Sequence, residues 1–332
     1  MAETVLVTGG AGFVGSWCVA ELLKQGYAVR ATLRDVARAK RVRPALEKEA
    51  AGKGALSFVA ADLISEAGWD AAMAGVDYVL HVASPLGGTT KGDLLTPARE
   101  GTLRVLRAAV KAGVKRVVMT SAAATTRGPL NSTKQNDETV WADPIDPQFD
   151  AYRRSKIMAE RAAWDFMKAE GGATQFTTVL PGAVFGPVLL KENLGSVAII
   201  QGLLNGRPSG VPRLGFWVVD VRDLAALHVK AMIAPEAAGE RFIVAGDFMW
   251  MKEIADVLRA RLGEAAAKAP TRELPDFAVR VSSLFVANLK QITPLLGKKI
   301  SQSSEKARRV LGFASRPGAD TVTDCARSLL GV

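Results

Sequence analysis

The segment DAYRRSKIMAERAAW (150–164) contains a tyrosine four residues before a lysine. In a helix, Tyr152 and Lys156 would lie on the same face, one turn apart. A free phenol titrates near ~10 and transfers protons poorly at neutral pH, but a neighbouring ammonium stabilises the phenolate and lowers its pKa. The pair is therefore a candidate proton donor with a tuning cation. The alternative is two ordinary side chains, since this spacing is common by chance.

A second candidate is the glycine-rich stretch VLVTGGAGFVGSW near the N-terminus, with Gly9, Gly12 and Gly15 three residues apart. It follows an apolar strand-like run and opens a helical pattern. Glycines at such a turn let the backbone approach a pyrophosphate, and the helix N-terminus attracts phosphate groups. This context favours a dinucleotide site over a merely flexible turn. The residues expected to contact the cofactor here are Thr8, Gly9, Gly12, Phe13 and Val14.

The end of the second expected strand indicates which dinucleotide is bound. NAD-binding proteins carry an acid some ~20 residues past the glycines, whereas a basic residue receives the extra phosphate of NADP. This chain has Arg34 there, with Asp35 directly after it. A basic corner suits a dianionic phosphate, so NADP(H) is the expected cofactor, and Asp35 keeps NAD as an option. The alternative is that these basic residues bind no cofactor and only form a solvated helix face. The corner consists of Arg34, Arg38, Lys40 and Arg41.

Two further strand ends complete the expected cofactor site. After the third strand, Asp62 would bond the adenine amino group and Leu63 would pack on the ring. The alternative role for Asp62 is an N-cap for the next helix, and the two roles are compatible. After the fourth strand, small residues leave room for the nicotinamide half at the carboxyl edge of the sheet. These residues are Val82, Ala83 and Ser84.

The scarcity of histidine and cysteine excludes several mechanisms. A Ser-His-Asp hydrolase would have to use His81 or His228. His228 falls inside a helical pattern and is expected to be a packing residue, whereas His81 ends a strand and is expected to line the cofactor wall. Cys18 and Cys325 are far apart, so neither a disulfide framework nor a thiolate metal site is indicated, and no metal is expected.

The chain has 43 basic and 33 acidic residues, a formal charge of +10, which favours an anionic partner. The basic residues are spread along the chain and no nucleic-acid-binding motif appears, so a phosphorylated cofactor explains the surplus better than nucleic acid. The N-terminus lacks the basic start and apolar run of a secretion signal, and no stretch reaches the ~18 apolar residues of a membrane span. We expect a soluble, cytoplasmic protein without membrane partners.

Short apolar runs alternate with helical patterns through the first half of the chain, which predicts an α/β fold with a doubly wound parallel sheet, the Rossmann type. A dinucleotide-binding domain is expected over 1–185 together with 215–234, and a smaller, mostly helical substrate-binding part over 186–214 and 235–332. The expected helices include 12–25, 97–112 and 152–169. The expected strands are 4–8, 28–33, 56–61, 77–82, 116–120 and 176–180, with another near 241–245.

These motifs, in this order and spacing, resemble the extended short-chain dehydrogenase/reductase family, and more narrowly its dihydroflavonol-reductase-like branch. VRATLRD, HVASP, RVVMTS and EKARRVLGF support the branch. The resemblance implies reversible NADPH-dependent reduction of an aldehyde or ketone, with the proton from Tyr152, Lys156 as its electrostatic partner and Thr120 beside the cofactor. It also implies backbone contacts to the nicotinamide amide from Pro181, Gly182, Ala183 and Val184.

The sequence departs from that branch at one catalytic position. The fifth strand of the branch ends Thr-Ser-Ser, and its second serine polarises the substrate carbonyl, whereas here the string is Thr120-Ser121-Ala122. Ser121 is the candidate replacement, but neighbouring strand residues point to opposite faces, so it reaches the carbonyl only if the chain bends. Thr125, Thr126 or a water molecule are the alternatives.

Two other functions fit the same fold. Nucleotide-sugar epimerases and dehydratases usually carry a VYG-like segment or an acidic pair after the serine strand, and SAAATTRG has neither. A dinucleotide-binding protein without catalysis is consistent with Ala122. For the reductase, apolar residues suggest an apolar or aromatic carbonyl substrate, although they serve equally as core. These are Pro85, Leu86, Leu189, Leu190, Phe216 and Trp217.

Overall fold

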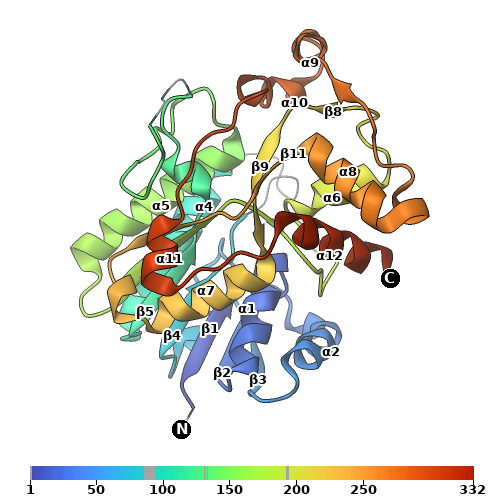
Figure 1. The fold of residues 1–332 in the computed structure, drawn as a ribbon. Coiled ribbons are helices and arrows are strands. Elements are labelled where there is room, and N and C mark those ends of the chain that lie inside the picture. The colour runs from blue at the N-terminus through green and yellow to red at the C-terminus, as the bar shows by residue number, and fades with distance from the viewer. Residues whose placement is uncertain (1, 86–93, 131, 133, 192–193) are drawn as a thin grey trace.

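The computed structural model describes residues 2–85, 94–130, 132, 134–191 and 194–332 (Figure 1). Its main body is a seven-stranded sheet in the order β10-β6-β5-β4-β1-β2-β3, in which every neighbouring pair is parallel. The doubly wound sheet predicted from the sequence is confirmed. Its strands are β1 (Thr4–Thr8), β2 (Ala28–Leu33), β3 (Leu56–Ala60), β4 (Tyr78–His81), β5 (Arg116–Thr120), β6 (Gln175–Pro181) and β10 (Arg241–Val244).

Helices cover both faces of this sheet because its strands are apolar on both sides. Along β1, Val5 and Val7 belong to one core and Leu6 to the other, as the alternation of side chains in a strand requires. One face is covered by α1 (Phe13–Lys24), α2 (Ala39–Ala50) and α7 (Val221–Ile233). The opposite face is covered by α3 (Trp69–Met73), α4 (Leu95–Lys111) and α5 (Ala151–Glu170).

The strand order reverses between β1 and β4. The chain builds outward from β1 through β2 to β3, then returns to the other side of β1 and continues through β4, β5 and β6. In open α/β sheets, ligands bind at the carboxyl ends of the strands at such a reversal. The fold therefore places the glycine loop after β1 directly beside the small residues after β4, at the carboxyl ends of two neighbouring strands.

A second, smaller part follows β6 and lies above the main sheet in Figure 1. It combines short strands with most of the later helices, as predicted. Its strands are β7 (Ala183–Phe185), β9 (Gly215–Asp220) and β11 (Phe248–Trp250) in one sheet, and β8 (Val211–Pro212) with β12 (Glu273–Leu274) in another. Its helices are α6 (Val197–Leu204), α8 (Met251–Leu262), α9 (Asp276–Ser282), α10 (Ala287–Lys290) and α12 (Gly318–Leu330).

Two strands cross the division drawn from the sequence. Residues 241–244 fall in the expected substrate-binding part, yet β10 is the edge strand of the main sheet, next to β6. Residues 215–220 fall in the expected dinucleotide-binding domain, yet β9 pairs with β7 and β11. The sequence pattern predicted the strand near 241–245, but the partners of a strand depend on long-range pairing. The helix α11 (Glu305–Leu311) packs on β10 and α7, so the C-terminal segment also returns to the main body.

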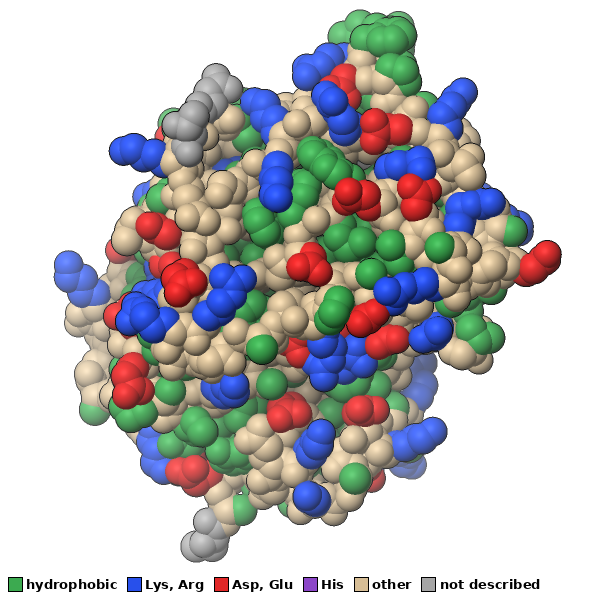
Figure 2. Space-filling model, in the orientation of Figure 1, with side chains coloured by type: hydrophobic (Ala, Val, Ile, Leu, Met, Phe, Trp, Pro, Cys, Tyr) green, Lys and Arg blue, Asp and Glu red, His purple; other side chains and the backbone are tan. Residues whose placement is uncertain are grey.

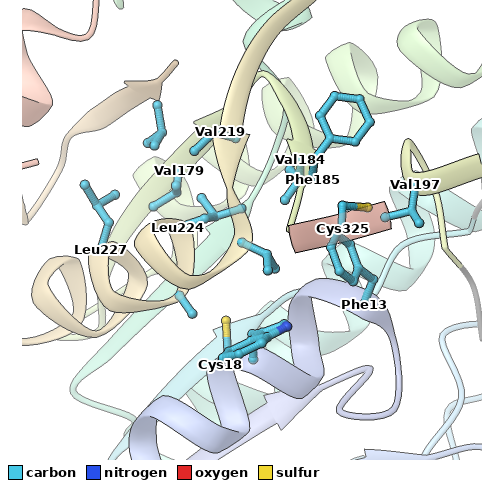
Figure 3. Close-up of a cluster of buried hydrophobic side chains, with 14 of the residues drawn as sticks. Phe13, Cys18, Val179, Val184, Phe185, Val197, Val219, Leu224, Leu227 and Cys325 are labelled. Atoms are coloured by element: carbon cyan, nitrogen blue, oxygen red, sulfur yellow. The ribbon is translucent and has the colours of Figure 1, made fainter. Parts of the chain in front are cut away.

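A continuous apolar core joins the two parts. Figure 3 shows Phe13 of α1 pointing toward Cys325 of α12 and Val197 of α6, with Phe185 of β7 nearby. Cys18 and Cys325 are both buried and free, and burial raises the pKa of each thiol well above its ordinary value. The two cysteines are therefore packing residues, which agrees with the expectation that they form no disulfide.

Charged side chains are mixed on the surface. Figure 2 shows Lys and Arg interspersed with Asp and Glu over the face in view. Within the described residues, no helix has the length and apolarity needed to cross a membrane. The same part of the chain holds no cluster of His, Cys, Asp and Glu suited to a metal ion.

Candidate active site

The glycine loop forms a close turn between β1 and α1. Gly9 has a φ of 70°, and its carbonyl accepts a 2.8 Å hydrogen bond from the backbone nitrogen of Gly12. A Cβ atom at Gly15 would overlap the carbonyl oxygen of Gly9, so no side chain fits there. Gly12 is the N-cap of α1 and provides no side-chain cap, which leaves the first N–H groups of the helix for a ligand. The loop therefore fits a pyrophosphate.

Of the other expected loop residues, Thr8 and Phe13 turn their side chains to structural uses. The hydroxyl of Thr8 lies 2.9 Å from Nδ1 of His81 and accepts a 3.0 Å hydrogen bond from the backbone nitrogen of Ala83. Phe13 is buried in the core, and Val14 is half-buried against it. Thr8 thus connects β1 to the segment after β4 by hydrogen bonds. Only the backbone atoms of Thr8 and Phe13 are left to contact a cofactor.

Neither histidine has the geometry of an acid–base group. His81 is buried between Thr8 and Thr102, and burial lowers its pKa to about 3. His228 lies 2.8 Å from the hydroxyl of Thr120 and 2.8 Å from the carbonyl of Leu224, and burial lowers its pKa to about 4. Both rings are therefore neutral at pH 7. The expectation that His228 is a packing residue is confirmed.

The basic corner follows β2 as expected. Leu33 is buried, and the next residue, Arg34, is exposed. Asp35 accepts a 2.9 Å hydrogen bond from the backbone nitrogen of Ala37 and so caps the short 3-10 helix Val36–Arg38. One carboxylate oxygen of Asp35, the residue that left NAD as an option, is therefore used in a local cap. This favours recognition of the cofactor by the basic residue Arg34 at this strand end. Lys40 and Arg41 are exposed in the first turn of α2.

The structure excludes one of the two roles considered for Asp62. The N-cap of α3 is Gly68, so Asp62 does not cap that helix, and its carboxylate instead accepts a 3.2 Å bond from the backbone nitrogen of Ile64. Leu63 is half-buried against Gly101 of α4. Both residues stay at the carboxyl end of β3, where the adenine was expected. Val82, Ala83 and Ser84 are half-buried after β4.

Tyr152 and Lys156 lie in the first two turns of α5. The helix begins after Asp150, whose side chain accepts a 2.7 Å hydrogen bond from the backbone nitrogen of Arg153. The buried Nζ of Lys156 donates a 3.1 Å hydrogen bond to the carbonyl of Thr120, the last residue of β5. This bond fixes the start of α5 at the carboxyl edge of the sheet. Tyr152 is half-buried one turn earlier.

Burial shifts the pKa values of both groups. Desolvation lowers the pKa of Lys156 to about 8, and the negative charge of Glu160 opposes this effect. Desolvation also raises the pKa of Tyr152 above its ordinary value. At pH 7 the structure therefore holds a protonated phenol and a predominantly cationic lysine. Tyr152 therefore carries a proton to donate, but burial raises its pKa instead of giving the lowering that was expected from the neighbouring ammonium.

The hydroxyls considered as replacements for the missing serine are engaged elsewhere. The buried Ser121 hydroxyl donates a 2.7 Å hydrogen bond to Glu160, two turns along α5 from Tyr152. The hydroxyls of Thr125 and Thr126, both fully buried, donate 2.9 Å bonds to the carbonyls of Ala122 and Ala123. The hydroxyls of Ser121, Thr125 and Thr126 therefore all donate to acceptors within the fold.

The partner of Ser121 belongs to a buried ionic network that sequence reasoning missed. Glu160 also accepts a 2.9 Å bond from Arg241 and a 3.0 Å bond from Thr178. The guanidinium of Arg241 lies 3.6 Å from the centre of the Trp141 ring. The sequence signal that could have predicted this network is the position of Glu160, four residues after Lys156 and on the same face of the helix. The network joins α5 to β6 and β10 behind the site.

The remaining expected contacts lie where β6 passes into β7. Pro181 and Val184 are buried, while Gly182 and Ala183 are half-buried. The backbone nitrogen of Gly182 donates a 3.0 Å bond to the carbonyl of Val244, so that N–H group is already used. A Cβ at Gly182 would overlap the carbonyl of Trp217, which explains the glycine.

The apolar residues expected to line a substrate pocket differ in their surroundings. Leu189, Leu190, Phe216 and Trp217 are half-buried, and the first three pack against the main core. The indole nitrogen of Trp217 donates a 2.6 Å bond to the carbonyl of Ile300. Pro85 is half-buried after β4, and Leu86 lies outside the described residues.

Comparison with known proteins agrees with this arrangement. The model of the NAD dependent epimerase/dehydratase family matches residues 5–245. The chain is 36% identical to the ketoreductase azaE of Aspergillus niger, with 99% of this chain and 98% of the relative covered. It is 35% identical to tetraketide alpha-pyrone reductase 1 of Arabidopsis thaliana, with 77% of this chain and 80% of the relative covered. The structure of yeast methylglyoxal/isovaleraldehyde reductase Gre2 complexed with NADPH superposes with a TM-score of 0.82 at 26% identity, covering 99% of this chain and 98% of that one.

Proposed function

We propose that this chain, which belongs to the NAD dependent epimerase/dehydratase family, is an NADPH-dependent reductase that converts an aldehyde or ketone to an alcohol. The observation that carries the proposal is the bond from Lys156 to the carbonyl of Thr120. It fixes Tyr152 at the carboxyl edge of β5, beside the crevice where a dinucleotide binds. The relatives named reductases, which align over most of the chain, support the same activity.

The residues present fit NADP(H). The cradle at Gly9, Gly12 and Gly15 would hold the pyrophosphate, and Arg34 would bind the ribose phosphate together with Lys40 and Arg41. Asp62 and Leu63 would contact the adenine. When bound, the reduced nicotinamide supplies the hydride that the carbonyl carbon receives.

The chain itself supplies the proton. Tyr152 donates its phenolic proton to the carbonyl oxygen, which becomes the alcohol oxygen. Lys156 carries a positive charge one turn away and stabilises the phenolate that remains, while its bond to Thr120 keeps the cation in place. Alanine at position 122 leaves the carbonyl oxygen without the serine hydroxyl found in the branch that the sequence resembles.

A test of the proposal is reduction of a carbonyl panel followed by NADPH absorbance. We expect turnover of at least one apolar aldehyde or ketone, and a loss of about 10²–10⁴-fold in kcat for Tyr152→Phe, the usual contribution of a general acid. Retained NADPH binding by that variant, measured by nicotinamide fluorescence, serves as the control. Silence across the panel would favour the non-catalytic dinucleotide-binding protein, and sugar-nucleotide turnover without net NADPH consumption would favour an epimerase.

A further inference from the structure

One face of α5 carries Tyr152, Lys156 and Glu160 at intervals of four residues, each one helical turn from the next. The last two hold consecutive residues at the end of β5. The Nζ atom of Lys156 donates a 3.1 Å hydrogen bond to the carbonyl of Thr120. The carboxylate of Glu160 accepts a 2.7 Å bond from the hydroxyl of Ser121. The helix is therefore attached to the strand at two adjacent points.

The hydrogen bonds of Glu160 fit a carboxylate and not a carboxylic acid. Its Oε1 atom accepts a 2.9 Å bond from Nε of Arg241 and a 3.0 Å bond from the hydroxyl of Thr178. Its Oε2 atom accepts the bond from Ser121 and lies 3.4 Å from Nη2 of Arg241. A proton on either oxygen would displace one of these donors. Glu160 therefore places a full negative charge in the interior, where its side chain is completely buried.

Two buried cations share this one carboxylate. Arg241 is paired with Glu160 directly, and it also donates to the carbonyls of Glu138 and Val140. Lys156, which is 4% exposed, has an uncharged carbonyl as its hydrogen-bond partner among the described residues. A buried charge is costly unless an opposite charge compensates it. Glu160, one turn along the helix, is the anion placed to compensate Lys156.

The other titratable groups around Lys156 supply no negative charge at pH 7. Tyr152 on α5 is protonated, because burial raises its pKa. His81 of β4 and His228 of α7 are neutral, because burial lowers their pKa values to about 3 and about 4. The only titratable residue of β5 is Arg116, at the amino end of the strand, and β6 and the 3-10 helix after β5 contain none. The helix α4, which packs against α5, buries no titratable side chain.

We propose that Glu160 is a positioning residue for the reaction, whose negative charge keeps the buried Lys156 cationic and in place. It acts through Lys156 and does not contact the substrate, because it is fully buried. The inference rests on the proposed reductase function and adds a residue to it. The alternative is a purely structural role, in which Glu160 only ties β10 to the sheet through Arg241. In the proposed role, Arg241 and Lys156 draw on the same negative charge, so their effects oppose each other.

The first variant is Glu160→Gln, which keeps the shape of the side chain and removes its charge. We measure kcat/KM under NADPH, from about pH 5.5 to about pH 9.5, for a carbonyl that the wild type reduces. The fall above pH 8 that is expected for the wild type should move down by about one to two pH units, the effect of a unit charge one helical turn away. Thr178→Val removes a bond to the same carboxylate but no charge, and as the matched control it should keep the wild-type profile.

Arg241→Gln separates the effect of charge from the effect of structure. It breaks the same ion pair as Glu160→Gln but leaves the carboxylate to Lys156 alone, so the fall should move to higher pH. In the purely structural role, both variants lose stability and neither moves the profile. If Glu160→Gln does not fold, the upward shift in Arg241→Gln is the test. Glu160→Asp retains the charge and should keep the wild-type profile.

The free energy of unfolding in urea provides a readout without catalysis. The loss of stability in Glu160→Gln should be larger at about pH 6.5 than at about pH 9, because Lys156 is mostly deprotonated at the higher pH in both folded proteins. An equal loss at both pH values, or profiles that do not move, overturns the role of Glu160 and leaves the reductase standing. A wild type that reduces no carbonyl overturns the proposed function and this inference with it.

Discussion

The hydroxyl of Ser121 donates a 2.7 Å hydrogen bond to the carboxylate of Glu160, in a fully buried setting. Through this bond Ser121 belongs to the buried ionic network of Glu160 and Arg241. The catalytic serine of the branch that the sequence resembles would stand one position later, at residue 122. Ala122, the next residue, has extended φ and ψ of −154° and 145°, so its Cβ points to the opposite side of the chain from Ser121. Ser121 and Ala122 are therefore adjacent in the chain, but their side chains face different surroundings.

If Ser121 is structural, Ser121→Ala should reduce stability and spare catalysis. The variant loses a hydrogen bond to a charged group, for which about 1.5–3 kcal/mol of unfolding free energy is typical. Urea unfolding measures this loss, and kcat is expected to change less than about threefold. Ser57→Ala, which removes a 3.2 Å bond to the carbonyl of Val29, is the matched control with a smaller expected loss. A large fall in kcat with unchanged stability would return Ser121 to the catalytic site.

Ala122→Ser should raise activity. The new hydroxyl would lie on the side of the chain opposite Ser121 and supply a donor to the carbonyl oxygen. Removal of one such donor from an oxyanion site costs about 10²–10³-fold in kcat, so a gain of up to that size is expected, reduced by imperfect placement. Ala124→Ser, in the adjoining 3-10 helix, controls for the added hydroxyl. An unchanged or lower kcat in Ala122→Ser would show that the site works without this donor.

The pH dependence of reduction should follow Lys156. Its pKa of about 8 means that the stabilising cation is present below pH 8 and disappears above it. We expect kcat/KM for reduction to fall above pH 8 in the wild type, and to be lower and flat from pH 6.5 to 9 in Lys156→Met. A wild-type profile without this fall would contradict the role of the ammonium.

The same shift gives a stability prediction with a definite sign. The folded pKa of Lys156 lies below its ordinary value of 10.5, so the folded state disfavours the cation, and this penalty acts fully below pH 8 and fades as the pH approaches 10.5. Lys156→Met should therefore be at least as stable as the wild type at pH 7, with the difference shrinking toward pH 10. Thermal unfolding at both pH values measures it. A variant that is less stable at pH 7 would show that the bond to Thr120 outweighs desolvation.

Arg34→Ala should weaken NADPH binding selectively. Loss of a charge-assisted hydrogen bond to a phosphate predicts an increase of about 10- to 100-fold in KM for NADPH, with little change for NADH. Lys53→Ala removes an exposed cation after α2 and is the control for net charge. Equal effects on both cofactors would place the NADPH preference elsewhere.

The sequence by itself determined which segments form the strands of the main sheet. Seven strands were expected, and the ends of all seven differ from the structure by at most one residue, because buried parallel strands are short apolar runs that a local pattern reveals. The glycine spacing and the Tyr152–Lys156 spacing are also local. Each requires only a turn or a helix, so each could be read before the fold was known.

Tertiary structure decided which side chains are available for chemistry. Ser121 was a candidate until Glu160, 39 residues later, accepted its hydrogen bond, and Asp62 lost its capping role because Gly68 begins the next helix. In the sequence Arg127 resembles any loop cation, and only the structure shows that its enclosed Nε and Nη1 atoms have no hydrogen-bond partner among the described residues. The physical reason is the same in each case. Hydrogen-bond and charge compensation depend on neighbours brought together by folding, and residue type or local spacing does not encode them.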